Sequence, residues 1–292
     1  KHDSGQTVDG VAIALSQHTT NHNVDINITG GTIKSSANGK AFYQDRLTET
    51  YTPSINITAD IAATTVEGAV EAAELGYNIV ENNGVYTLVY VGFEAQIGEV
   101  KYETLVEAVE EAQAGDVVTL LKSATGAGLV IDKNVTIDFN EKTYTVNQAV
   151  GSAGTETLGF QILKNNTVTL MNGTLTSTAA VEGSKEIKML IQNYANLTLT
   201  DMNLDDATEH IQYVLSNNSG TSKINGATSI TTDKVAFDVY DYTAGGYTAP
   251  EVNVNTTGII DGKIEVSESI SNNLNISGGL FTAQIAEAWC AD

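Results

Sequence analysis

The sequence predicts an all-β protein, a parallel β-helix solenoid with short capping helices. Triplets of apolar, Thr or Asn, and apolar residues recur along the 292 residues, which is the period of a β-strand. Their second apolar residues are 33 positions apart from Ile137 to Leu170 and 22 apart from Val254 to Ile276, as in an irregular solenoid. Hairpin turns every 8–12 residues or so, which a meandering β-sandwich needs, are scarce.

Each repeat is expected to be a strand, one sharp bend and a second strand that faces the same core. The strands begin at Ile26, Ile55, Val135, Val168, Leu197, Val252 and Leu274, and Ile224 belongs to a weaker copy. In four repeats a residue type that tolerates left-handed backbone follows, at Gly30, Asn172, Asp201 or Gly278. An apolar residue returns three positions later, at Ile33, Leu175, Leu204 or Phe281.

The segment 101–116 predicts a helix that caps the start of these repeats. Thr104 and Glu107 have the spacing of a capping box, and Gly115 ends the pattern. Leu105, Val109 and Ala112 form one apolar stripe. Such caps are needed because an uncovered solenoid end exposes strand edges and core.

Two further segments are predicted to cap a solenoid. The segment 64–77 has the same helical signals, with Thr64 and Glu67 in the capping positions. The tail 281–292 follows the last repeat and is expected to cover its end.

The near-repeat of "NITGGTIK" (27–34) and "NISGGLFT" (275–282) indicates late repeats of two successive modules. We expect residues 1–80 to hold the C-terminal repeats and cap of a first module. Residues 81–98 are expected to be a connector hairpin with its turn at "NNG" (82–84), and residues 99–292 a second module. The chain begins with Lys1, which suggests a piece of a longer protein.

"YETLVEAVEEAQAGDVVTLL", "LVIDKNVTIDFNEKTYTV" and "ISGGLFTAQIAEAWCAD" resemble the start and end of right-handed parallel β-helix modules of the pectin-lyase-like superfamily. The resemblance covers 99–292 well and 24–90 more loosely. It departs from the pattern at Asn140–Glu141, in place of Asn-Gly, and at Trp289, in place of Tyr. It implies a surface protein of Gram-positive bacteria, and the role proposed for such modules is usually adhesin-like.

Composition restricts the partners. The formal charge of −22 disfavours nucleic acid and anionic lipid, and no apolar run approaches the roughly 20 residues of a membrane-spanning helix. The single cysteine, Cys290, excludes an internal disulfide. We expect it to be a buried, inert thiol in an apolar helix beside Trp289.

A polysaccharide lyase or hydrolase is the alternative to a non-catalytic module. Lyases of this fold need an Arg or Lys base beside carboxylates, and residues 99–292 contain no arginine. Hydrolases need clustered carboxylates, for which Asp205, Asp206 and His210 are the one candidate group. The competing interpretation is that both aspartates cap a turn in solvent. No catalytic residue is therefore assigned.

No cofactor and no designed metal site are expected. His2, His18, His22 and His210 lack the spacing of metal ligands, and no calcium loop of the D-x-D-x-D-G type occurs. Stacked strands would place Thr136, Thr169, Thr198, Asn253 and Asn275 in one outward row beside Asn134, Thr167, Asn196 and Asn273. Such a row either binds a glycan or hydrogen-bonds along itself.

The candidate ligand-binding residues are Tyr240, Asp241, Tyr242 and Tyr247, which surround Gly245–Gly246 in one loop. Exposed tyrosines stack on sugar rings, with Asp238 or Asp241 as hydrogen-bond partner. The alternative is that they pack a long turn against the solenoid. The sequence thus favours a secreted, cell-surface module that acts as a rigid spacer and contacts a glycan or a host or microbial protein, beside neighbouring modules of its own chain.

Overall fold

The computed structural model describes residues 92–206, 208 and 210–291, together with the backbone of eight strands between residues 13 and 90. Contacts divide the chain into two compact units, Lys1–Gly92 and Phe93–Asp292. The division falls within the segment 81–98. The structure is mostly β, so the all-β prediction is confirmed.

Six of the eight described strands of the first unit form three parallel pairs. These pairs are β1 (Ile13–Gln17) with β4 (Phe42–Arg46), β2 (Asp25–Ile28) with β5 (Ser54–Ile57), and β3 (Thr32–Ile33) with β6 (Ile61–Ala63). Ile26 lies opposite Ile55, as expected for equivalent positions of successive repeats.

A hairpin with its turn at the predicted "NNG" is present, but it spans residues 77–90 rather than the predicted 81–98. Strand β7 (Tyr77–Asn82) pairs antiparallel with β8 (Val85–Tyr90), and Asn82 lies opposite Val85. Strand β8 also pairs with β6, so the hairpin belongs to the first unit. Residues 64–76 of the predicted helix lie outside the described residues, and Tyr77 is in a strand rather than in that helix.

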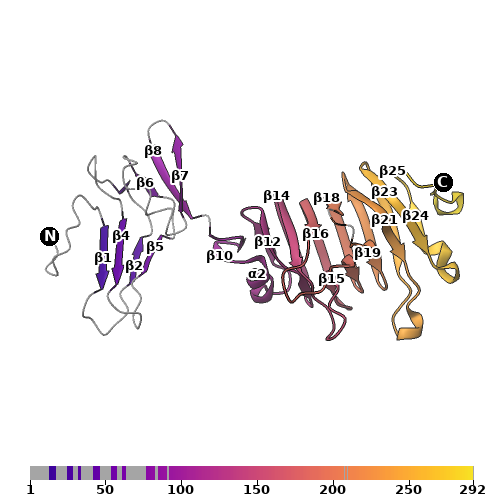
Figure 1. Cartoon of the computed structure of the whole chain (residues 1–292). Helices are drawn as coiled ribbons and strands as arrows, with labels where there is room; N and C mark the ends of the chain where they lie inside the picture. The colour runs from indigo at the N-terminus through magenta and orange to yellow at the C-terminus, as the bar shows by residue number, and fades with distance from the viewer. Residues whose placement is uncertain are drawn as a thin grey trace. The chain divides into compact units, whose positions relative to one another are not determined.

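The second unit is one large, mostly parallel sheet (Figure 1), and the strand pairing arranges its strands in three rows. Row A contains β11 (Val117–Leu120), the first parts of β14 (Val135–Gln148), β16 (Thr167–Ser177) and β18 (Asn196–Asp205), then β20 (Thr221–Gly226), β22 (Glu251–Thr256) and β24 (Leu274–Ile276).

Row B contains β12 (Ala124–Ala127), the second parts of β14, β16 and β18, the first parts of β21 (Ser229–Val239) and β23 (Ile259–Val266), and β25 (Leu280–Phe281). Row C contains β13 (Leu129–Ile131), β15 (Leu158–Ile162), β17 (Met189–Asn193), β19 (Tyr213–Asn217) and the second parts of β21 and β23. Along the chain the rows recur in the order A, B, C, and each strand pairs in parallel with its equivalent one cycle later.

The bends between row A and row B lie where the sequence predicts left-handed residues. Asn172 has φ 60° and Asp201 has φ 54°, and both residue types tolerate this conformation. At the last bend the positive φ falls on Gly279 rather than on the predicted Gly278. Gly30 lies outside the described residues.

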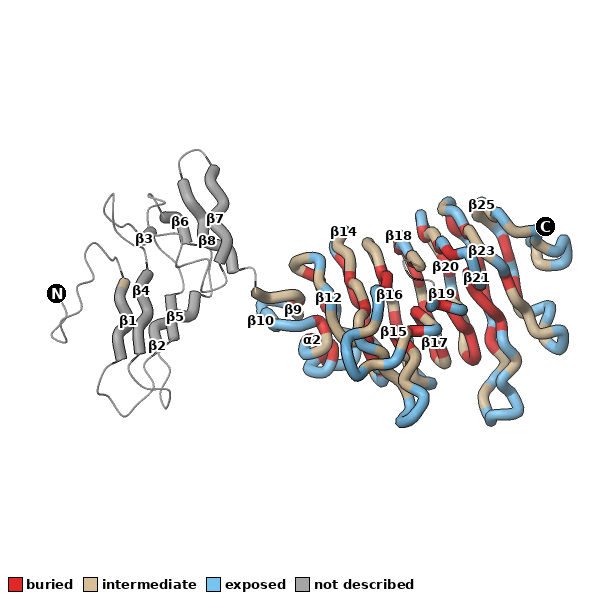
Figure 2. Tube along the Cα trace, in the orientation of Figure 1, coloured by how far each residue is buried: buried red, intermediate tan, exposed pale blue. Residues whose placement is uncertain are grey.

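The core consists of inward side chains stacked in register across the strands. One column of it joins the predicted second apolar positions, Ile137, Leu170, Leu199, Ile224, Val254 and Ile276. All of them are buried, which fits the buried stripes along the strands in Figure 2. The alternation of apolar and polar residues therefore sets which face of each strand turns inward.

The predicted N-terminal cap is confirmed in type but is shorter than its pattern. Helix α2 (Leu105–Glu111) begins after Thr104, whose hydroxyl accepts from the Glu107 N–H at 3.0 Å. The three predicted stripe residues are buried, and Gly115 has φ 96°. The antiparallel strands β9 (Ala95–Ile97) and β10 (Val100–Tyr102) precede it, and β9 also pairs with β11.

The tail packs against the last strands, but without an α-helix. Phe281, Ile285 and Trp289 contact the core, and residues 287–289 form a single 3₁₀ turn. Cys290 follows this turn and is exposed, so the prediction of a buried thiol in a helix is wrong. The backbone pairs there instead, since Cys290 bridges to Ile276 in parallel.

The predicted outward polar row is present on row A. Thr136, Thr169 and Thr198 lie in register, followed by Lys223, Asn253 and Asn275. The Nδ2 of Asn275 donates to the Oδ1 of Asn253 at 3.2 Å, so the end of this row hydrogen-bonds along itself. In the neighbouring row the Oδ1 of Asn134 accepts from the Thr167 N–H at 2.7 Å.

Candidate functional site

A cluster of four tyrosines lies at the end of row C. Tyr240 directly follows β21, and Tyr242 and Tyr247 belong to the loop 240–250 that leads to β22. Tyr194 lies in the tight turn between β17 and β18. We call these four residues the tyrosine cluster.

The rings of the tyrosine cluster contact one another. The centroids of Tyr194 and Tyr247 are 4.8 Å apart, and those of Tyr242 and Tyr247 are 5.3 Å apart in a stacked arrangement. Tyr240 and Tyr194 each lie about 6 Å from Tyr242, at 6.1 and 6.2 Å. Tyr240 is 49% exposed and Tyr242 is 37% exposed, while the other two rings are half-buried. The cluster is therefore packed on one side and open to solvent on the other.

Asp241 holds the loop in this shape. Its Oδ1 accepts from the backbone N–H and the hydroxyl of Thr243, at 3.0 and 2.6 Å, and its Oδ2 accepts from the hydroxyl of Ser269. These hydrogen bonds lower the pKa of Asp241, and the one from Ser269 has the largest effect. The carboxylate that the sequence proposes as a ligand contact therefore already has three donors within its own surroundings.

Gly245 and Gly246 allow the loop to fold under the rings. A Cβ on Gly245 would lie 2.7 Å from the Cζ of Tyr242, too close for any larger residue without movement. Gly246 has φ 82°, the left-handed conformation that ends the turn Thr243–Gly245. The glycine pair that the sequence places among the tyrosines is thus a condition for their stacking.

Three hollows surround the tyrosine cluster, and Tyr194 lines all of them. The first, about 360 Å³, also contains Tyr213, Tyr240, Tyr242 and Asp238 in its lining. The second, about 540 Å³, and the third, about 340 Å³, share Lys164 and Tyr247 in their linings. The cluster therefore separates hollows of different charge, one with a carboxyl group and two with an ammonium group.

Asp238 is buried beside the first hollow, which we call the Asp238 hollow. Its Oδ1 accepts from the Asn217 N–H at 2.7 Å and its Oδ2 from the hydroxyl of Ser216 at 3.1 Å. Burial raises the pKa of Asp238 to about 7, although both hydrogen bonds lower it, and the Glu265 carboxylate adds to the rise. This carboxyl group therefore changes its charge near neutral pH.

Sequence reasoning missed Tyr194 and Lys164. The Nζ of Lys164 lies 5.5 Å from the centroid of the Tyr247 ring, within the range of a cation–π contact. Tyr194 lies 46 positions before Tyr240 in the chain. The residues that precede them, Asn193 and Val239, both pair with Asn217 on the strand between them. Aligning the ends of the row C strands is the signal that places Tyr194 near Tyr240.

The residues of the enzymatic alternative have separate partners. Asp206 accepts from the hydroxyl of Thr232 at 2.8 Å and from the Thr208 N–H at 3.1 Å, and burial raises its pKa. The Nε2 of His210 lies 3.7 Å from an oxygen of Glu186. Asp205 lies at the end of β18, and its carbonyl accepts from the hydroxyl of Thr176 at 2.8 Å.

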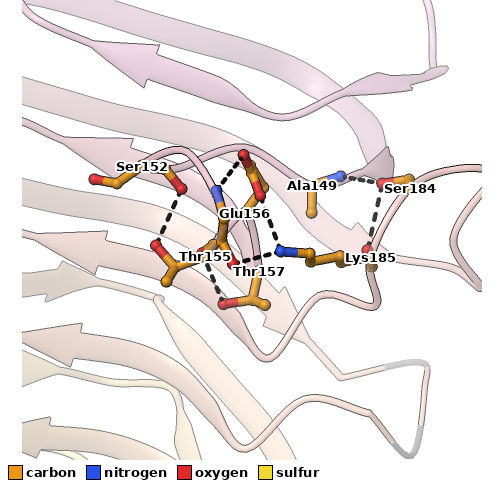
Figure 3. Close-up of polar contacts among 8 residues, drawn as sticks. Ala149, Ser152, Thr155, Glu156, Thr157, Ser184 and Lys185 are labelled. Carbon is orange, nitrogen blue, oxygen red and sulfur yellow. Dashed lines mark hydrogen bonds and ion pairs between the residues drawn. The ribbon is translucent and has the colours of Figure 1, made fainter.

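Nearby loops are held by similar local contacts. In the loops 149–157 and 178–188, Lys185 and Glu156 point toward each other, with 3.1 Å between Nζ and Oε2 (Figure 3). Backbone N–H groups of Glu156 and Gly154, followed by Lys185, lower the pKa of Glu156 to about 2. The Oγ of Ser184 accepts from the Ala149 N–H at 3.0 Å. These polar groups stabilise loop structure.

A larger hollow of about 780 Å³ follows the bends between row A and row B, and its lining includes Asp138, Glu141 and Asp201. Asp138 accepts from the Asn140 N–H at 2.8 Å, and Asp201 accepts from the Ala227 N–H at 2.7 Å. Among the described residues, no group of three or more His, Cys, Asp or Glu side chains is arranged to hold a metal ion. His2, His18 and His22 lie outside the described residues.

In the described part of the chain, no helix has the length and apolar character needed to cross a membrane. Comparison with protein-family models, with curated proteins and with solved structures finds no match to this chain.

Proposed function

We propose that this chain is a non-catalytic, right-handed parallel β-helix module that serves as a rigid spacer and binds a glycan through its tyrosine cluster. The observation that carries the glycan proposal is the cluster itself. The centroids of its contacting ring pairs are 4.8–6.2 Å apart, two of its four rings are exposed, and three hollows lie beside it. Flat, amphipathic rings with hydroxyl groups suit a sugar, which has apolar faces and polar edges.

The parallel β-helix proposal is supported by the recurrence of rows A, B and C. Each cycle of three strands pairs with the next cycle, and the columns of buried residues run through all of them. In the first unit, too, strands β1, β2 and β3 pair in parallel with β4, β5 and β6, which follow in the same order. A stack of this kind is stiff because each cycle is held by its neighbours.

The non-catalytic proposal is supported by the surroundings of Asp205, Asp206 and His210. An acid–base pair of a glycosidase needs two carboxyl groups that face one substrate bond. Asp206 is instead engaged by Thr232 and Thr208, and His210 lies beside Glu186. A cell-surface location on a Gram-positive bacterium follows from the sequence resemblance and remains part of this proposal.

The exposure of the cluster favours a binding surface over a purely structural stalk. A loop that only packs against the solenoid would bury its rings, whereas Tyr240 and Tyr242 are 49% and 37% exposed. The loop is nevertheless held in place by Asp241 and Ser269, so a ligand would meet an ordered surface.

The test is a glycan-array screen of the whole chain beside the variant Tyr240→Ala/Tyr242→Ala/Tyr247→Ala. We expect binding that the variant loses at least tenfold, while Ile259→Ala, an exposed apolar residue of row B, retains it. Thermal melting of each variant shows whether the fold is intact. Binding that survives in the folded triple variant, or no binding by the unaltered chain, contradicts the glycan proposal.

A further inference from the structure

The lining of the Asp238 hollow combines aromatic side chains with one acidic side chain. Tyr194, Tyr213, Tyr240 and Tyr242 line its sides, and Gln192 and Asp238 add polar groups. Asp238 is only 7% exposed. The hollow has a volume of about 360 Å³, which is enough for a small polar group with part of a sugar ring. The aromatic rings and the carboxyl group therefore face the same space.

The charged groups around this hollow are mainly acidic. Glu265 lies opposite Asp238 on the neighbouring strand, and one of its oxygens accepts from the hydroxyl of Tyr213 at 3.4 Å. Its other oxygen is engaged by the Nζ of Lys263 at 2.5 Å, so that lysine is already paired. The titratable groups near Asp238 are therefore Glu265 with its partner Lys263 and the phenols that line the hollow, Tyr194, Tyr213, Tyr240 and Tyr242.

The lining of the Asp238 hollow, all of it described, contains no lysine or arginine. Lys164 lines the two other hollows and lies over Tyr247. An anionic sugar would thus meet a carboxyl group with no cation in the lining to balance it. A cation would meet tyrosine rings and the Asp238 carboxyl group, and both the face of such a ring and an ionised carboxylate attract positive charge.

We propose that the Asp238 hollow binds the protonated amine of an amino sugar, with the Asp238 carboxylate accepting from the ammonium group and the tyrosine rings against the sugar. This inference rests on the proposed glycan binding and names its ligand class. A primary ammonium has three donors, and each oxygen of Asp238 has capacity beyond the one hydrogen bond that it accepts from Asn217 or Ser216. The N-acetylated sugar lacks the charge, and a uronic acid carries the opposite one.

Titration calorimetry of the whole chain at pH 7 tests this inference. The three probes are a β-1,4-linked glucosamine tetramer, its N-acetylated counterpart and a galacturonic acid tetramer. The ordinary pKa of an α-amino group is about 8, and the oxygens of a sugar ring lower that of its amine, so only part of the amines carry the proton at this pH. We expect the glucosamine tetramer to bind at least tenfold more tightly than either of the others.

The variant Asp238→Asn removes the charge but keeps the size of the side chain. We expect it to lose at least tenfold in affinity for the glucosamine tetramer and to retain its affinity for the N-acetylated tetramer. The matched control is Asp233→Asn, which makes the same substitution in a side chain that is 72% exposed and outside the hollow. The control is expected to bind as the unaltered chain does.

A competition experiment on the unaltered chain does not depend on the folding of any variant. Tetramethylammonium, a permanent cation that tyrosine rings attract, is expected to displace the glucosamine tetramer. Lack of displacement, equal binding of the three tetramers, or an unchanged affinity in folded Asp238→Asn overturns the inference. Equal or tighter binding of a lysine tripeptide also overturns it, because the amine alone would then suffice.

The two proposals fail in different ways. If the glycan array shows binding only to sugars without an amine, and the tyrosine variant loses it, the proposed function holds and this inference falls. If no glycan binds, both fall together.

Discussion

At the scale of single residues, Asp238 near the end of row C makes the stability of the fold depend on pH. Asp238 has a pKa of about 7 in the folded chain against an ordinary value of 3.8. The folded chain therefore binds this proton more tightly than the unfolded chain does. The stability that Asp238 contributes is full below pH 4 or so and is lost as the pH rises through about 7.

We predict that Asp238→Asn flattens this dependence. A rise of about three pKa units corresponds to as much as about 4 kcal/mol in the free energy of unfolding, at order-of-magnitude precision. Urea unfolding of both proteins between pH 4 and pH 8 measures it. The variant should gain stability relative to the unaltered chain as the pH rises, and a constant difference would contradict the assignment.

Asn172 shows how one residue sets a bend. Its φ of 60° is costly for most residue types, and its Nδ2 donates to the Oδ1 of Asp138 at 3.1 Å. We predict that Asn172→Val destabilises the chain by about 2 kcal/mol, since a β-branched residue tolerates this conformation poorly. Asn172→Gly is the control and should cost less, because glycine keeps the conformation and loses only the side-chain bond. Equal urea midpoints for the two variants would contradict this explanation.

At the scale of elements, the alternation of apolar and polar residues forms the strand rows, and capping segments cover the two ends of the second unit. Helix α2 covers the start of the second unit, where Leu105 and Ala108 are fully buried. In its first turn the Glu107 N–H donates to the hydroxyl of Thr104. The Glu103 N–H donates to the Glu107 carboxylate at 3.2 Å. The predicted capping box is thus present, with its return bond one residue earlier than in the usual arrangement.

We predict that Thr104→Ala destabilises the second unit by about 1 kcal/mol, within the range of about 0.5–2 kcal/mol for N-cap losses. The orphaned N–H of Glu107 is the cause. Thr104→Ser retains the hydroxyl and should restore most of the stability. Thermal or urea unfolding checks the series, and equal stability of the Ala and Ser variants would show that the hydroxyl contributes nothing.

At the scale of the whole molecule, the chain divides into two compact units, Lys1–Gly92 and Phe93–Asp292. The core cluster described for the second unit runs from Ala95 to the residues that pack against it near Trp289, entirely within Phe93–Asp292. We predict that residues 93–292 alone unfold in one cooperative transition, at the temperature of the corresponding transition of the whole chain. Calorimetry measures this, and a broad or absent transition would show that the first unit is required.

Local features of the sequence predicted much of the second unit. The strand alternation, the bends at Asn172 and Asp201 and the N-cap at Thr104 all depend on residues within a few positions of each other. Even the weak copy around Ile224 was placed correctly, since Ile224 pairs with Leu199 and is fully buried. Cys290 was misjudged because an apolar composition does not reveal whether a short tail forms a helix or a single turn.

By itself, the sequence determined the all-β class, the inward face of the strands and the loop that bears Tyr240, Tyr242 and Tyr247, because these follow from local periodicity and turn chemistry. Only the tertiary structure decided that Tyr194 and Lys164 join Tyr247, and that Asp238 is buried beside Ser216 and Asn217. Those neighbours are tens of residues apart in the chain. They meet through the register of parallel strands and the lengths of the loops between them, which no local pattern encodes.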